Sequence, residues 1–66
     1  MRIHILLEGG YHYISKDNEG LSSKEAIDIF KTQIDDLKFL VADLEDDSFL
    51  LIGPDTLKKA HFIFKD

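Results

Sequence analysis

His4, His12 and His61 are the side chains of this chain best suited to bind a metal ion. A two-residue hairpin turn at Gly9-Gly10 would point His4 and His12 to opposite faces of the hairpin. His61 lies far along the chain, and no two histidines have the spacing of ligand pairs on a helix. We therefore predict half-exposed strand histidines and no metal site, and we keep a small-ligand or divalent-metal-binding domain as the alternative function.

An acidic run forms the densest group of charges in the chain: Asp43, Glu45, Asp46 and Asp47. Carboxylates gathered on a turn can bind calcium or magnesium. Counted from Asp43, however, an EF-hand loop would need glycine where Ser48 stands and a bidentate carboxylate where Pro54 stands. We interpret the run as a solvated hairpin turn, with a weak divalent site or an acidic docking patch as the alternative.

The nearest approach to a nucleophilic site combines Ser15, His4 and Asp17. The two-residue turn would place His4 opposite Ser15, with Asp17 close by in the sequence. A hairpin end that faces water does not by itself supply an oxyanion pocket or a base held by a carboxylate. We therefore predict that the chain is not an enzyme, with no catalytic residues and no cofactor.

Size and charge restrict the remaining classes of function. The chain has 66 residues, a net charge of −5 and no cysteine, which limits it to a single small domain over residues 1–66 and excludes a disulfide framework. Acidity argues against direct binding of nucleic acid or of anionic membranes. We expect a cytoplasmic protein with neither of these partners, and no motif identifies a family.

The elements that must position these residues begin with two strands. Residues 2–8 alternate apolar and polar side chains, and β-type residues resume at 11–14 after the glycine pair. The two-residue turn predicts one face with Ile3, Ile5, Leu7, His12 and Ile14. It predicts the opposite face with His4, Leu6, Tyr11 and Tyr13.

A helix over about 22–37 follows, because Ser22 and Glu25 have the spacing of a capping box. Its apolar stripe consists of Ile27, Phe30, Ile34 and Leu37. Ile29 falls to one side of that stripe and is either a rim residue or a contact.

Two further apolar runs, 39–42 and 49–52, predict a second hairpin across the acidic turn. A turn of two or four residues places Phe39, Val41, Leu50 and Ile52 on one face. Pro54 begins a turn or a single helical turn, and residues 61–65 form a last strand. The predicted order is ββαβββ, an α+β domain with a mostly antiparallel sheet and the helix packed on one sheet face.

One helix can cover one face of such a sheet, so the second face is left with apolar side chains. We predict that these residues form an interface: Phe39, Val41, Leu50, Ile52 and Ile29. A homodimer or higher homo-oligomer would cover them, unless the sheet closes into a partial barrel. The predicted function is a small acidic protein-interaction module that binds itself and a possible protein partner. A further alternative is an acidic inhibitor of a nucleic-acid-binding protein, which would present Asp28, Asp35, Asp36 and Glu45.

Overall fold

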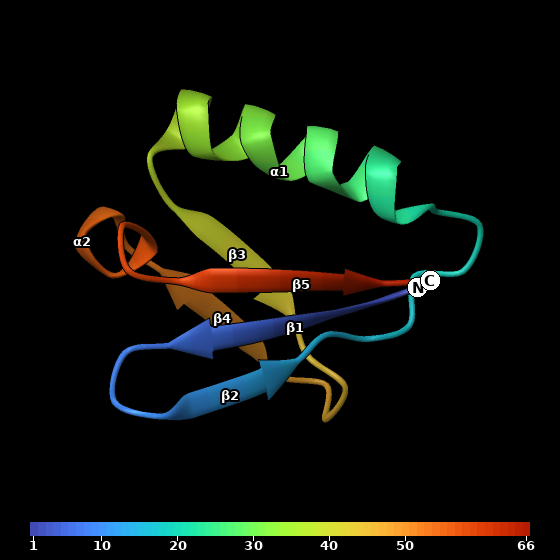
Figure 1. Ribbon diagram of the computed structural model, residues 1–66, viewed down its shortest axis with the longest axis horizontal. Helices are drawn as coiled ribbons and strands as arrows, with labels where there is room; N and C mark the ends of the chain where they lie inside the picture. Colours follow the sequence, from blue (N-terminus) through green and yellow to red (C-terminus); the bar gives the residue numbers. More distant parts are fainter.

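The computed structural model describes residues 1–66, apart from the side chain of Leu37, so the place of Leu37 in the predicted stripe lies outside the described residues. The described backbone forms five strands and two helices (Figure 1). The strands pair into antiparallel sheets, and the fold is of the α+β class. Their bounds are β1 (Arg2–Leu7), β2 (Tyr11–Ile14), α1 (Ser23–Leu37), β3 (Leu40–Asp43), β4 (Phe49–Ile52), α2 (Pro54–Leu57) and β5 (His61–Lys65). The predicted fold class is therefore confirmed.

The start of α1 follows the capping signal. The Ser22 hydroxyl accepts a hydrogen bond from the Glu25 amide at 3.2 Å and donates one to Glu25 Oε1 at 2.9 Å. The helix ends at Lys38, whose backbone is left-handed at φ 63° and whose amide donates to the Ile34 carbonyl. Local residues therefore determine both ends of α1, and the predicted helix is confirmed.

The first hairpin has a three-residue turn, Glu8 to Gly10, in which Gly9 and Gly10 take φ values of 91° and 83°. The strand partners are therefore shifted by one residue from the prediction, with Leu7 opposite Tyr11 and not His12. Because neighbouring strand residues point to opposite faces, this shift reverses every side chain of β2. The predicted faces of the hairpin were wrong: the tyrosines share a face with Ile3, Ile5 and Leu7, and His12 shares one with His4.

The second hairpin shows the same kind of difference. Its loop, Leu44 to Ser48, has an odd number of residues, so Val41 pairs with Leu51 and Leu40 pairs with Ile52. The prediction that Leu50 and Ile52 share the outer face with Val41 was wrong. The odd loop turns both residues inward and turns Phe49 and Leu51 outward.

The strands form two sheets, one in the order β2-β1-β5 and the other from β3 and β4. The inner faces of both sheets contribute to one core, which consists of Ile3, Ile5, Leu40, Ala42, Leu44 and Ile52. A single antiparallel bridge between Ser15 and Leu44 joins the sheets at one corner. The buried Ser15 hydroxyl accepts a hydrogen bond from the Ile3 amide at 2.9 Å, so this backbone amide of β1 has a partner at that corner.

Helix α1 lies alongside β5 and β3, so it contacts one strand from each sheet (Figure 1). Phe30 forms edge-to-face contacts with Phe62 and Phe64 of β5, with ring centroids 5.7 and 5.3 Å apart. Edge-to-face pairs of this kind add stability beyond the buried area of the rings. The helix therefore completes the core at the Phe62 and Phe64 end.

Candidate functional site

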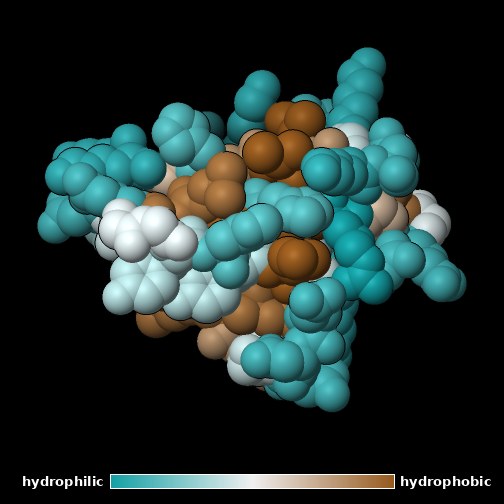
Figure 2. All heavy atoms as spheres, turned by 60° about the horizontal axis from the view of Figure 1, so that its bottom comes forward, coloured by the Kyte–Doolittle hydropathy of each residue, from teal (hydrophilic) through white to brown (hydrophobic). Residues whose placement is uncertain are grey.

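The outer face of the β3-β4 sheet carries four exposed apolar side chains. Phe49 is 73% exposed and Leu51 is 67% exposed, both on β4. Val41 on β3 is 48% exposed, and Phe39, directly before β3, is 38% exposed. We call these four residues the β3-β4 apolar face. In the space-filling view, apolar side chains reach the molecular surface among hydrophilic ones (Figure 2).

The structure divides the predicted interface residues among three places. Phe39 and Val41 lie on the β3-β4 apolar face. Ile52 belongs to the core at 2% exposure, and Leu50 is half-buried against that core. Ile29 is 45% exposed on α1. Whatever covers the outer sheet face therefore meets neither Leu50 nor Ile52.

Phe49 and Leu51 are the residues of this face that sequence reasoning missed. The missing information was the parity of the loop after β3, because an odd loop exchanges the two faces of β4. Asp47 adopts a left-handed backbone at φ 70°, a conformation that Asp tolerates better than most residues. That Asp in a five-residue acidic loop was the available signal for the longer turn.

The β3-β4 apolar face has a definite size. Multiplying the exposed fractions by about 200 Å² for Phe and about 170 Å² for Val or Leu gives roughly 400 Å². The largest apolar patch of a typical monomer covers about 300–600 Å² and is often functional. The face therefore matches in size the largest apolar patch of a typical monomer.

Strand β4 also forms an edge of its sheet, because β3 is its only neighbour in the described strand order. The Leu44 amide donates to the Ser48 carbonyl at 2.9 Å, and the alternation of an antiparallel ladder then points the amides of Phe49 and Leu51 away from β3. Edge strands are usually protected by charge or proline. The sequence of β4, FLLI, contains neither.

Charged groups border the apolar face at the acidic turn, and each of its carboxylates has a partner. Lys16 Nζ lies 2.6 Å from Asp47 Oδ1 and 3.7 Å from Asp43 Oδ1. The hydrogen bond with Asp47 and the charge of Asp43 raise the pKa of Lys16. Arg2 Nη1 lies 3.3 Å from Glu45 Oε2.

The remaining carboxylate of the turn, Asp46, accepts hydrogen bonds from the hydroxyl and amide of Ser48, which lower the pKa of Asp46. Asp43 and Asp47 thus share a lysine, whereas Glu45 engages an arginine and Asp46 a serine. Within the described residues, no group of three or more histidines or acidic side chains could hold a metal ion.

A second cluster is the histidine pair on the outer face of β1 and β2. His4 Nδ1 lies 2.9 Å from His12 Nε2, with the ring centroids 5.1 Å apart and the ring planes inclined by 39°. The prediction that these histidines point to opposite faces was wrong, because the three-residue turn moves His12 to the face of His4. A three-residue hairpin loop with a left-handed glycine is a common class, so the sequence Glu8-Gly9-Gly10 is compatible with this turn as well as with the two-residue one.

The protonation of His4 follows from its surroundings. Partial burial, then the positive charge of Lys65 and the neighbouring His12, lower the pKa of His4 below its ordinary value of 6.5, and Glu45 acts in the opposite direction. His4 therefore favours its neutral form near neutral pH. In a neutral pair, one imidazole nitrogen donates its proton and the other accepts it.

His61 shares the outer face of the β2-β1-β5 sheet with this pair. It lies opposite Leu6, whose partner on the other side is His12. His12 and His61 are thus separated by the full width of β1. The structure brings two of the three predicted histidines together and leaves the third on another strand.

Ser15, His4 and Asp17 do not form a nucleophilic site. Ser15 lies opposite Ile3, and its hydroxyl donates to the Lys16 carbonyl at 3.0 Å. The Asp17 carboxylate binds the Met1 ammonium at 2.9 Å. Each side chain is thus used in holding the strand ends together.

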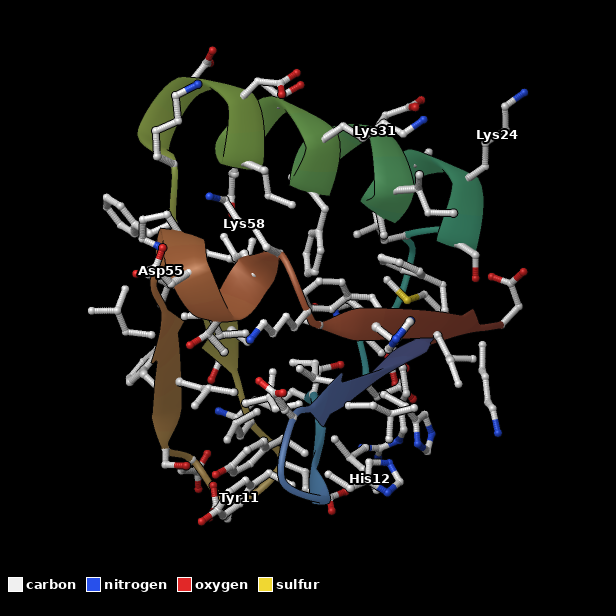
Figure 3. The ribbon with its side chains drawn as sticks, turned by 60° about the vertical axis from the view of Figure 1, so that its left-hand side comes forward. Tyr11, His12, Lys24, Lys31, Asp55 and Lys58 are labelled. Carbon is white, nitrogen blue, oxygen red and sulfur yellow. The ribbon has the colours of Figure 1, made fainter. Side chains whose placement is uncertain are left out.

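A shallow groove of about 280 Å³ lies between the end of α1 and α2. Its lining residues are Ile34, Asp35, Lys38, Pro54, Leu57 and Lys58. Figure 3 shows Lys58 on the α2 side of this region, below α1. The lining offers an apolar floor with charges at its rim and no histidine or hydroxyl group, so it lacks the usual parts of a catalytic site.

Comparison with models of protein families, with curated proteins and with solved structures found no match to this chain. Among the described residues, no helix has the length and apolar character needed to cross a membrane.

Proposed function

We propose that this chain is a non-enzymatic protein-interaction module that forms a homodimer through the β3-β4 apolar face. One observation carries the proposal: four exposed apolar side chains gather on the outer face of a two-stranded sheet whose inner face is core. Burying such a face against an identical one removes apolar surface from water on both copies. A two-fold axis through the face generates this contact with a single patch used twice.

The small area of the face favours a weak dimer. A stable standard interface buries about 800 Å² from each partner, whereas this face supplies roughly 400 Å². Face-to-face packing of two sheets about 10 Å apart would bury Phe49 and Leu51 most, since they are the most exposed members. We therefore expect a weak dimer whose population depends on concentration.

The net charge of −5 supports a distinctive salt dependence. Two acidic copies repel each other, and added salt screens that repulsion while it leaves apolar contacts in place. Dimerisation should therefore strengthen with salt. An acidic inhibitor of a nucleic-acid-binding protein would show the opposite, because its attraction to a basic partner weakens with salt.

Sedimentation equilibrium over about 1 µM to about 1 mM tests the proposal. The expected average mass rises from 7.6 kDa toward twice that value as concentration increases. A constant mass of 7.6 kDa over the whole range would contradict it.

A matched pair of variants tests the location of the interface. Leu51→Lys places two charges in the proposed contact, one from each copy, and should weaken dimerisation about tenfold or more. Ile63→Lys is the control, because Ile63 is an exposed strand residue at 44% on the outer face of the other sheet. Both variants should keep the wild-type circular dichroism spectrum. Equal weakening by the two substitutions would place the interface elsewhere.

A further inference from the structure

We propose that His4 and His12 together bind one divalent ion of the late first-row transition metals, such as Ni²⁺, Cu²⁺ or Zn²⁺. The site lies on the outer face of β1 and β2 and is separate from the β3-β4 apolar face. In Figure 3, His12 projects from β2 on the side away from β4. Imidazole nitrogens are the ligands that these metals share.

The distance between the two nitrogens fits one bound ion. Two imidazole nitrogens that each lie about 2.0–2.1 Å from a metal are about 2.9 Å apart at a right angle and about 3.3 Å apart at the tetrahedral angle. His4 Nδ1 and His12 Nε2 are 2.9 Å apart. The separation matches neighbouring ligands of an octahedral or square-planar ion, and a ring rotation that breaks the hydrogen bond would direct both lone pairs to that ion.

The sheet holds the backbone of both ligand residues in place before a metal arrives. His4 pairs with Ile14 and Leu6 pairs with His12, so the histidines are diagonal neighbours on adjacent hydrogen-bonded strands. Such neighbours are within reach of long or aromatic side chains without any change of the backbone. Binding therefore costs the hydrogen bond between the two rings and their rotational freedom, but no rearrangement of the backbone, and the exposed side leaves positions for water on the metal.

The charges around the pair determine its affinity and its pH dependence. Lys65 on β5 and Arg2 on β1 oppose a cation at this position, and Glu45 favours one. The site should therefore be weaker than one with three protein ligands. A protonated imidazole nitrogen cannot bind a metal, so binding should weaken at acid pH.

Isothermal titration of the untagged chain with NiCl₂ near neutral pH tests the site. The expected result is one Ni²⁺ per chain, together with a rise in melting temperature that grows with metal concentration. His4→Asn and His12→Asn should each weaken binding about tenfold or more, because each removes one of two ligands. Asn keeps a polar side chain at these exposed strand positions, and circular dichroism checks that each variant is folded.

His61→Asn is the matched control, because His61 lies on the same sheet face but on β5. It should leave Ni²⁺ binding unchanged. Equal weakening by all three substitutions would indicate unspecific binding to surface histidines and would overturn the proposal. So would the absence of binding, or one Ni²⁺ per two chains. The Leu51→Lys variant should still bind Ni²⁺, which separates failure of this site from failure of the dimer.

Discussion

Leu51 and Ile52 are neighbours on β4 that point in opposite directions, so their truncation to alanine tests the arrangement of the second hairpin. Ile52 is 2% exposed in the core, whereas Leu51 is 67% exposed on the β3-β4 apolar face. The two side chains have similar volumes and chemistry. Any difference in the effect of the two substitutions on folding therefore arises from their direction.

The magnitude for Ile52→Ala follows from burial. Loss of three buried methyl or methylene groups at about 0.8 kcal/mol each gives about 2.4 kcal/mol, and the cavity left behind raises the range to about 2–5 kcal/mol. A chain of 66 residues has a total unfolding free energy of about 3–10 kcal/mol. Ile52→Ala should therefore remove a large share of the stability. Leu51→Ala should cost less than about 1 kcal/mol in the monomer.

Urea unfolding followed by circular dichroism measures both effects. It should be done at a concentration where sedimentation shows the monomer, because dimerisation would add a concentration-dependent term to Leu51→Ala. If Ile52→Ala leaves no folded protein, Ile52→Val provides the measurable case, with an expected loss of about 0.5–1.5 kcal/mol.

The reasoning is refuted if Leu51→Ala destabilises the monomer as much as Ile52→Ala does. That result would mean that Leu51 is buried and that the pairing of Val41 with Leu51 is wrong. The β3-β4 apolar face would then have to be redefined on the other set of residues, Leu50 and Ile52.

Two further predictions concern the ends of α1. Lys38→Gly should raise the unfolding free energy by up to about 1 kcal/mol in urea titrations. Lys38 has a left-handed backbone at φ 63°, which glycine adopts without steric cost. A loss of stability would show that the Lys38 side chain contributes more than its backbone strain costs. At the other end, Asp66 Oδ1 accepts hydrogen bonds from the Ser23 amide at 2.9 Å and hydroxyl at 3.0 Å, which lower the pKa of Asp66 below its ordinary value of 3.8. The stability that these hydrogen bonds add to the folded state is present above pH 3.8 and is lost as the pH falls through the lower pKa of folded Asp66. Asp66→Asn should therefore be less stable than wild type at neutral pH and equally stable at the acid end of the range. Urea midpoints measured over a series of pH values test this expectation. A constant difference at every pH would show that the carboxylate charge is not involved.

Local signals were sufficient to predict α1, the approximate position of each strand, and a turn or single helical turn at Pro54, where the structure has α2. Ser22 and Glu25 satisfy each other within one helical turn, and Pro54 starts α2 by its own fixed backbone angle. These effects need no knowledge of the rest of the chain. The α+β class could be predicted from such signals alone.

The faces of the strands could not be predicted in this way, because they depend on the parity of two loops. Glycine at Gly9 and Gly10 fits turns of two or three residues equally well. The choice depends on which residues of β2 pack into the core. Tyr13 packs against the core and Ser15 is buried next to it, whereas His12 is exposed, and only the three-residue turn gives this arrangement of β2.

The sequence by itself showed that this small acidic protein has more apolar strand residues than one helix can cover. Only the tertiary structure decided which of those residues are covered. Two sheets around one core bury Ile52 and leave Leu51 outside, and the same one-residue shift in the first hairpin brings His4 to 2.9 Å from His12. The physical reason is the two-residue period of a strand, which converts a single residue of loop length into an exchange of the inner and outer faces.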